Sequence, residues 1–146
     1  MVYLGADHNG LKMKEELKNE LRRHAIAFCD AAPFVSTAAD YPSIAARVAR
    51  FMKRDHGSTG LLLCGSGNGM VMAANRFRHI RAALAPSIRY AVKARTDEDA
   101  NVLVLPAWWI TRTEAIRIVR AWRTARPSRA RRHQRRIAQL TLLHGG

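Results

Sequence analysis

Short apolar runs alternate with amphipathic stretches along the whole chain. The apolar runs predict strands, and they cover residues 2–6, 25–29, 60–64, 80–84 and 101–105. Between them, apolar residues recur at every fourth position over residues 13–21 and 44–52, the spacing of a helix with one buried face. Thr111 and Glu114 have the spacing of a capping box, which predicts the start of a further helix.

Five strands separated by helices predict an α/β fold, namely a three-layer αβα, Rossmann-like sandwich around a five-stranded parallel sheet. Residues 31–40 and 77–79 are predicted to be connecting loops. Ligands of such sheets bind beyond the carboxyl ends of the strands. Asp7, His8, Cys64 and the turn after Leu84 should therefore lie on one rim of the sheet.

The chain has 146 residues, which fits one domain over residues 1–146. It has no leader segment and no apolar run long enough to cross a membrane, so a cytoplasmic protein is expected. Its two cysteines lie on predicted strands and are expected to be reduced. Cysteine pairs or Cys/His clusters with the spacing of metal ligands are absent, so we expect no structural metal.

Positive charge is concentrated near the C-terminus, in a chain whose net charge is +14. A basic helix is predicted at about residues 128–142, and its arginines fit a solvated face, a nucleic-acid surface or a phosphate site. Arg132 and Arg136 are four residues apart and share one helix face, so they can grip one phosphate together. Aromatic residues that would stack on bases are missing from residues 123–136, which weakens the nucleic-acid interpretation.

Cys64 lies where an apolar run meets a turn containing Gly65, Gly67 and Gly69. Glycines allow a tight turn whose backbone N–H groups converge on one point, where an anion can bind. Residues 70–75 favour a helix, and its positive end should lower the thiol pKa of Cys64 and make it a base near neutral pH. The alternative is that Cys64 is a small buried hydrophobic residue.

Several short motifs occur in one order that resembles the ribose-5-phosphate isomerase B and galactose-6-phosphate isomerase family. They cover residues 5–12, 40–42, 64–69, 73–75, 80–84, 99–103 and 132–136, and the resemblance extends from residue 1 to about 140. It implies interconversion of an aldose phosphate and a ketose phosphate through a cis-enediolate, without metal or other cofactor. It also implies a homodimer or a dimer of dimers whose active sites are shared between subunits.

By this resemblance Cys64 moves the proton between C1 and C2 of the sugar. The backbone N–H groups of residues 65–69, including Gly65, Gly67, Asn68 and Gly69, would hold the enediolate oxygen. Ser66 would form a hydrogen bond with a sugar oxygen. Some relatives use a glutamate just after the glycine turn, but Met70 stands there in this chain and cannot take up a proton.

The resemblance also assigns the substrate-binding residues. Asp7 would accept hydrogen bonds from sugar hydroxyls and His8 would reach the phosphate, although Asp7 also suits the cap of the helix that follows it. Tyr41 would line the sugar pocket, although a tyrosine before proline is commonly a packed loop residue. Arg132 and Arg136 match the phosphate-binding pair of the family.

Two departures from the family pattern bear on the substrate. Asp97 and Glu98 stand where ribose-phosphate enzymes carry a His-Asn pair whose histidine helps to open the furanose ring. A carboxylate of this pair has taken over that step, or the substrate has no ring to open, or activity on ribose 5-phosphate has been lost. Trp108 and Trp109 replace a Gly-Ala-Arg segment, and their bulk narrows the pocket or packs a dimer.

The sequence therefore predicts an isomerase of the ribose-5-phosphate isomerase B type, with Cys64, Ser66 and Asp97 as catalytic residues and Glu98 near the substrate. Ribose 5-phosphate and ribulose 5-phosphate are the expected pair. The alternatives are a tetrose 4-phosphate, which cannot close a furanose ring, a hexose 6-phosphate, or a non-catalytic relative that binds nucleic acid. A membrane partner is not expected.

Overall fold

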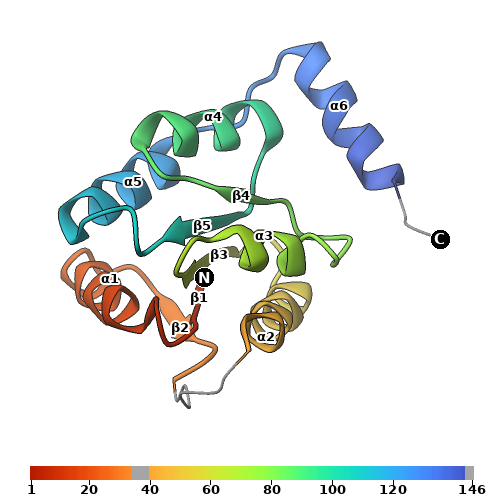
Figure 1. The fold of residues 1–146 in the computed structure, drawn as a ribbon. Coiled ribbons are helices and arrows are strands. Elements are labelled where there is room, and N and C mark those ends of the chain that lie inside the picture. Colours follow the sequence, from red (N-terminus) through yellow and green to blue (C-terminus); the bar gives the residue numbers. More distant parts are fainter. Residues whose placement is uncertain (34–39, 144–146) are drawn as a thin grey trace.

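The computed structural model describes residues 1–33 and 40–143, so residues 34–39 of the loop predicted over residues 31–40 lie outside the described residues. The described part of the chain alternates strands and helices (Figure 1). The elements are β1 (Val2–Ala6), α1 (Leu11–Arg23), β2 (Phe28–Asp30), α2 (Tyr41–Arg54), β3 (Thr59–Cys64), α3 (Asn68–Ala74), β4 (Ala82–Leu84), α4 (Ile88–Glu98), β5 (Val102–Pro106), α5 (Arg112–Thr124) and α6 (Arg131–Leu142).

The strands form one parallel sheet in the order β2-β1-β3-β5-β4. From β1 the chain runs outward to β2 at one edge and then returns to β3 on the other side of β1. The order of the strands therefore reverses between β1 and β3, and sheets of this kind bind ligands beyond the carboxyl ends of their strands at such a point. The predicted fold class is confirmed.

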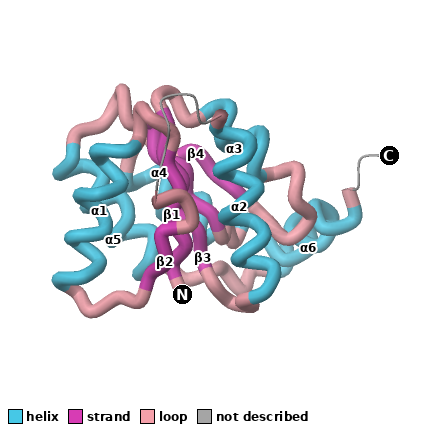
Figure 2. Tube along the Cα trace, turned by 90° about the horizontal axis from the view of Figure 1, so that it is seen from below, coloured by secondary structure: helices cyan, strands magenta, loops and turns pink. Residues whose placement is uncertain are grey.

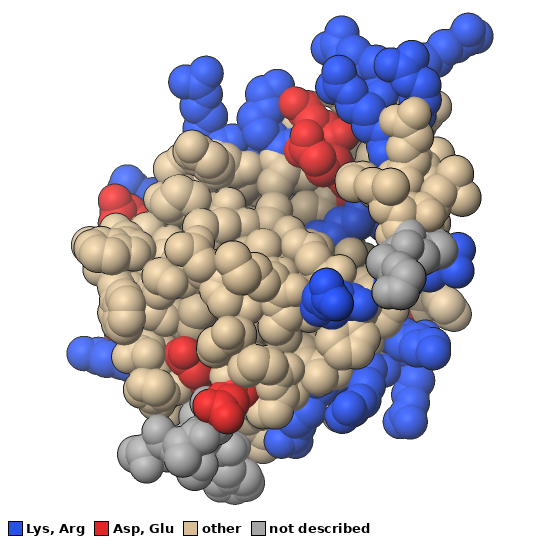
Figure 3. All heavy atoms as spheres, turned by 45° about the vertical axis from the view of Figure 1, so that its right-hand side comes forward, with Lys and Arg blue, Asp and Glu red and all other residues tan. Residues whose placement is uncertain are grey.

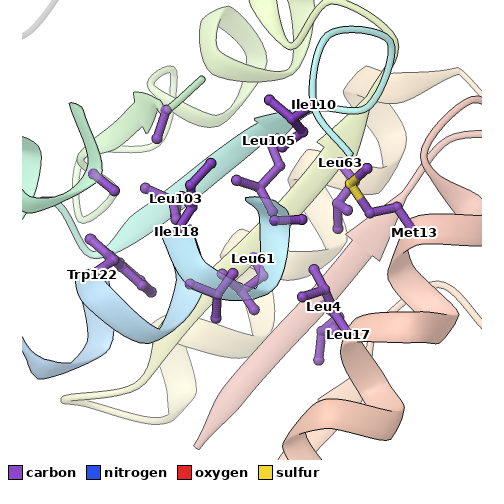
Figure 4. Close-up of a cluster of buried hydrophobic side chains, with 14 of the residues drawn as sticks. Leu4, Met13, Leu17, Leu61, Leu63, Leu103, Leu105, Ile110, Ile118 and Trp122 are labelled. Atoms are coloured by element: carbon purple, nitrogen blue, oxygen red, sulfur yellow. The ribbon is translucent and has the colours of Figure 1, made fainter. Parts of the chain in front are cut away.

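Helices cover both faces of the sheet and make three layers (Figure 2). Alternate strand residues point to opposite faces, so Leu61 and Leu63 pack in one cluster, while Leu62 and Cys64 pack in the other. The first cluster is closed mainly by α1 and α5 (Figure 4), and the second by α2 and α3. β3 is buried on both faces, which explains its uninterrupted apolar sequence.

β2 and β4 start two or more residues later than the sequence predicts. Residues 25–27 do not extend β2, because Ala25 has φ 51° and the Ile26 N–H donates to the Leu21 carbonyl in the turn after α1. Likewise, the Ile80 N–H donates to the Phe77 carbonyl in a turn and is not available to β4. Turn geometry therefore shortens both edge strands.

α4 and α6 are the helices for which the apolar pattern of the sequence says least. α4 buries only the small side chains of Ala91 and Ala94, so the apolar spacing gives little signal for it. α6 begins three residues later than predicted and packs against α4, from which it projects beyond the three layers (Figure 1). No helix among residues 1–33 and 40–143 combines the length and apolar character needed to cross a bilayer.

Candidate active site

Asp7 and Cys64 lie side by side at the carboxyl ends of β1 and β3. The two strands pair with Ala6 opposite Leu63, and the Asp7 N–H donates to the Leu63 carbonyl at 3.2 Å. Both side chains are almost enclosed, with exposed fractions of 7% for Asp7 and 5% for Cys64. The sheet therefore brings the predicted carboxylate and thiol to one rim, as expected.

The glycine turn after β3 folds back onto the thiol. Gly67 has φ +86°, a conformation that side chains with Cβ rarely adopt, and its N–H donates to Cys64 Sγ at 3.1 Å. A Cβ at Gly67 would collide with the Leu84 side chain. Only glycine at this position lets the backbone pass so close to Leu84 and point its N–H at the sulfur.

The pKa of the Cys64 thiol is raised, and the prediction that it is lowered is wrong. Burial is the main cause, and the nearby Asp7 carboxylate adds to it. The N–H groups of Gly67 and Met70 favour the thiolate but do not offset burial. The sequence argument considered the helix end without the desolvation of the sulfur. In the isolated chain the thiol is therefore protonated at neutral pH.

Asp7 also has the structural role that the sequence left open. Its Oδ1 accepts hydrogen bonds from the N–H groups of Asn9 and Gly10, both at 3.0 Å. α1 itself begins at Leu11, so the carboxylate holds the turn before the helix rather than its first residues. His8 is exposed on the same turn, and its Nε2 lies 3.0 Å from Asn9 Nδ2.

Two aromatic rings flank the glycine turn. Tyr41, the first residue of α2, covers Gly69, where a Cβ would lie 2.6 Å from the Tyr41 Cζ atom. Trp108 covers Gly65, where a Cβ would lie 2.5 Å from its Cζ2 atom, and the Trp108 N–H donates to the Gly65 carbonyl at 3.1 Å. Trp108 is nevertheless 61% exposed, so much of its ring remains open to solvent. The structure thus places Trp108 against the glycine turn that follows Cys64.

Ser66 and Asn68 form the outer part of the turn. Ser66 is partly exposed, Asn68 is exposed, and the Asn68 N–H donates to Ser66 Oγ at 3.4 Å. This long contact leaves the hydroxyl available to a ligand. The predicted residues of the glycine turn therefore surround the thiol on the same rim as Asp7, His8 and Tyr41.

Four predicted site residues lie toward the amino ends of the strands, away from Cys64. They are Asp97, Glu98, Arg132 and Arg136. α4 starts just after β4 and runs back beside the sheet, and its 11 residues span about 16 Å. Asp97 and Glu98 form its last turn, close to the start of β5. Because α6 packs on α4, Arg132 and Arg136 belong to the same end of the molecule. One chain does not bring these four residues to Cys64.

Asp97 is held by its own helix. Its carboxylate accepts hydrogen bonds from Thr96 Oγ1 at 2.9 Å and Lys93 Nζ at 3.2 Å, and these two contacts lower the pKa of Asp97. The carboxylate is therefore ionised at neutral pH and has no proton to donate. Glu98 is exposed and lines a cavity of about 370 Å³ together with Arg81 and Leu140.

The first turns of α6 carry positive charge without an acidic residue. Arg132 Nε donates to His133 Nε2 at 3.1 Å, and Arg136 is exposed one turn further on. On the face drawn in Figure 3, Lys and Arg side chains gather mainly toward the top right and the lower right, while the left part of the face is largely uncharged. Within the described residues, no three His, Cys, Asp or Glu side chains gather into a group able to hold a metal ion.

Comparisons with known proteins agree over the whole chain. Residues 2–140 match a family model described as Ribose/Galactose Isomerase. Ribose-5-phosphate isomerase B of Mycobacterium tuberculosis is 39% identical over 138 residues, which cover 93% of this chain and 85% of that protein. A probable ribose-5-phosphate isomerase B of Mycoplasma pneumoniae is 34% identical over 140 residues, covering 95% of this chain and 91% of the relative.

Solved structures with the same fold carry related names. The crystal structure of a ribose 5-phosphate isomerase from Thermotoga maritima superposes with a TM-score of 0.92 at 35% identity and covers 97% of both chains. Ribose-5-phosphate isomerase B from Mycoplasma genitalium, solved with bound ribulose-5-phosphate, superposes with a TM-score of 0.90 at 34% identity. That likeness covers 97% of this chain and 93% of the Mycoplasma chain.

Proposed function

The chain belongs to the ribose/galactose isomerase family, and on this premise we propose that it interconverts ribose 5-phosphate and ribulose 5-phosphate with Cys64 as the base. The sequence-based prediction of an isomerase of the ribose-5-phosphate isomerase B type is confirmed. The observation that carries the assignment of Cys64 is its position at the end of β3, where the Gly67 N–H meets its sulfur at 3.1 Å.

The reaction is a proton transfer between two neighbouring carbons. The Cys64 thiolate removes the proton from C2 of the open-chain aldose phosphate, and the electron pair forms the C1–C2 double bond while O1 becomes negative. The O2 proton passes to O1, and the Cys64 thiol returns its proton to C1. The products are the ketose phosphate and the original thiolate, so protons and electrons balance.

The glycine turn stabilises the charge that develops on the substrate. Its backbone N–H groups form a preorganised oxyanion site, in which a single donor typically contributes about 3 kcal/mol to transition-state stabilisation. Ser66 Oγ lies at the outer side of the turn and assists the transfer between O2 and O1. The Asp7 carboxylate accepts hydrogen bonds from sugar hydroxyls and so orients the substrate beside Cys64.

The phosphate end of the substrate is bound by the partner subunit. Arg132 and Arg136 suit a phosphate because they are exposed, adjacent on α6 and free of acidic neighbours on their helix. They lie on the α4 side of the molecule, whereas Cys64 lies at the carboxyl edge. The active site therefore combines His8 and Cys64 of one subunit with the two arginines of another, in a homodimer or a dimer of dimers.

Conversion of ribose 5-phosphate to ribulose 5-phosphate by the purified protein tests the assignment, with Cys64→Ala measured alongside. Turnover by the wild-type protein that vanishes in the variant is expected. Free phosphate should inhibit the wild-type protein competitively. Equal turnover by both proteins would contradict the role of Cys64.

Mixed subunits test the shared site. Cys64→Ala and the double variant Arg132→Ala, Arg136→Ala are each expected to be nearly inactive at low substrate concentration. Unfolding and refolding an equal mixture creates hybrid dimers with one intact site, so about a quarter of the wild-type activity should return. Refolded single variants serve as controls. If the mixture stays inactive while forming dimers, the shared site is wrong.

A tetrose 4-phosphate is the second candidate substrate. Asp97, which stands where ribose-phosphate enzymes have the ring-opening histidine, is ionised and has no proton to donate to a furanose ring. Trp108 lies against Gly65, next to Cys64 in the sequence. Both features suit a shorter sugar phosphate that has no furanose ring. Poor conversion of ribose 5-phosphate together with fast conversion of erythrose 4-phosphate would favour this candidate, and slower conversion of the tetrose phosphate would eliminate it.

A further inference from the structure

The side chains of Asp97 on α4 and of His133 and Arg132 on α6 make successive contacts, which we call the Asp97–His133–Arg132 chain. Arg132 Nε donates to His133 Nε2 at 3.1 Å, and His133 Nδ1 lies 3.8 Å from Asp97 Oδ1. His133 is only 8% exposed. Its Nδ1 is one of three buried side-chain nitrogen or oxygen atoms without a hydrogen-bond partner in the described part of the chain. Such an atom calls for an explanation.

The hydrogen bond to Arg132 determines where the imidazole carries its proton. Because Nε2 accepts from the arginine, the neutral ring is protonated on Nδ1, the nitrogen that faces Asp97. At 3.8 Å the contact with the carboxylate is longer than a hydrogen bond, and a small rotation of either side chain closes it. Contacts of this kind in unliganded sites commonly tighten when the ligand binds.

Hydrogen bonds hold the Asp97 side chain on α4 and join α4 to the segment that precedes α6. Thr96 and Lys93 hold the Asp97 carboxylate on α4, and the Ser128 N–H donates to the Thr96 carbonyl at 2.8 Å. This backbone bond ties the segment before α6 to the last turn of α4. The same bond keeps the carboxylate and the imidazole close enough for a small side-chain rotation to join them.

We propose that Asp97 and His133 are positioning residues that aim the Arg132 guanidinium at the substrate phosphate, an inference that rests on the proposed function. Asp97 orients the imidazole, and the imidazole holds the Nε–H of Arg132, so that both terminal amino groups of the guanidinium remain for phosphate oxygens. A carboxylate bonded directly to Arg132 would compete with the phosphate for these groups. The intervening ring avoids this competition. Asp97 then acts on binding and not on proton transfer.

Inorganic phosphate is the probe for this arrangement, and calorimetry on the full-length protein measures its Kd. Asp97→Ala should raise the Kd about tenfold, the loss expected for one hydrogen bond to a charged group. Asp97→Asn should stay close to wild type, because its amide oxygen still accepts from Nδ1. Glu16→Ala removes an equal charge from α1 and should leave the Kd unchanged. Thermal unfolding of each variant verifies the fold.

A double-mutant cycle tests whether Asp97 acts through Arg132. In an Arg132→Ala background, Asp97→Ala should weaken phosphate binding no further. The proposal is overturned if Asp97→Ala weakens binding equally in both backgrounds, if Asp97→Asn is as weak as Asp97→Ala, or if the wild-type protein binds no phosphate.

Steady-state kinetics separate this proposal from the proposed function. Asp97→Ala should raise KM for the sugar phosphate with little change in kcat, whereas a proton-transfer role would lower kcat in both the Ala and the Asn variant and leave the phosphate Kd unchanged. If the wild-type protein converts no sugar phosphate while the phosphate Kd values follow the prediction, positioning stands and the proposed function fails. If conversion is normal and the Kd values do not respond, the positioning role fails alone.

Discussion

Cys64 at the end of β3 and Arg132 on α6 represent two ways of holding a functional side chain. Cys64 is enclosed by the core, its neighbours are backbone N–H groups and Asp7, and its strand is buried on both faces. Arg132 is exposed on α6, a helix that packs mainly against α4, and its guanidinium donates a hydrogen bond to the His133 side chain. The first residue is fixed by the fold, and the second depends on its local neighbours.

The difference matches the chemistry that each end is proposed to perform. Proton transfer needs a fixed geometry and a dry environment, because small displacements of a reacting group cost rate. Binding a dianionic phosphate needs positive charge that stays in water until the ligand arrives, because burying unpaired arginines is costly. The thiol is therefore enclosed at the carboxyl ends of the strands, while the arginines of α6 are exposed to water.

The largest effect is expected at Gly67, one of two glycines with positive φ that lie at opposite ends of β3. Gly67→Ala should lower the free energy of unfolding by about 2–4 kcal/mol, since it adds left-handed strain to a collision with Leu84. It should also abolish activity, because the N–H would leave the sulfur. Chemical denaturation and the isomerase assay measure both effects.

Gly57 supplies the matched control at the amino edge. Its φ is +82°, but a Cβ there would meet nothing within 4 Å, so Gly57→Ala isolates the backbone strain. We expect a loss of about 1 kcal/mol and full activity. Equal losses in both variants would show that packing against Leu84 contributes nothing to the turn.

Sequence patterns predict the carboxyl edge well because its determinants are local. The apolar run of β3 stops where the glycines begin, and Asp7 follows an equally clear strand, so parallel pairing alone brings Asp7 to Cys64. The raised thiol pKa was missed because desolvation depends on the atoms that enclose the sulfur, which no sequence spacing describes.

The α4–α6 end is harder to predict because its arrangement is tertiary. α4 packs through alanines, which give no amphipathic signal, and its direction alone decides that Asp97 lies away from Cys64. The four-residue spacing of Arg132 and Arg136 correctly predicts that they share one helix, but their separation from the thiol follows only from how α6 packs. The contact between His133 and Asp97 joins residues far apart in sequence, so no motif announces it.

The next largest effect is expected on KM, when an arginine of α6 is replaced. Arg136→Ala should raise KM about tenfold and change kcat little, because a bond to the phosphate is made equally in the ground state and the transition state. Arg135→Ala removes the same charge from the neighbouring position and should have a much smaller effect. If the two variants raise KM equally, the substrate is attracted by the general positive charge of α6 and not by a specific contact with Arg136. Added salt should then abolish the difference in KM between each variant and the wild-type protein.

The smallest effect concerns pH and sharpens the account of Cys64. Because the folded protein raises the thiol pKa, the reactive thiolate is scarce at neutral pH, and kcat/KM should increase with pH with a slope of about one on logarithmic axes. Asp7→Asn removes the carboxylate that disfavours the thiolate but keeps an oxygen for the N–H groups of Asn9 and Gly10. The inflection of its profile should therefore move to lower pH than in the wild-type protein. An unchanged inflection would mean that Asp7 does not influence the thiol, and burial alone would then account for its raised pKa.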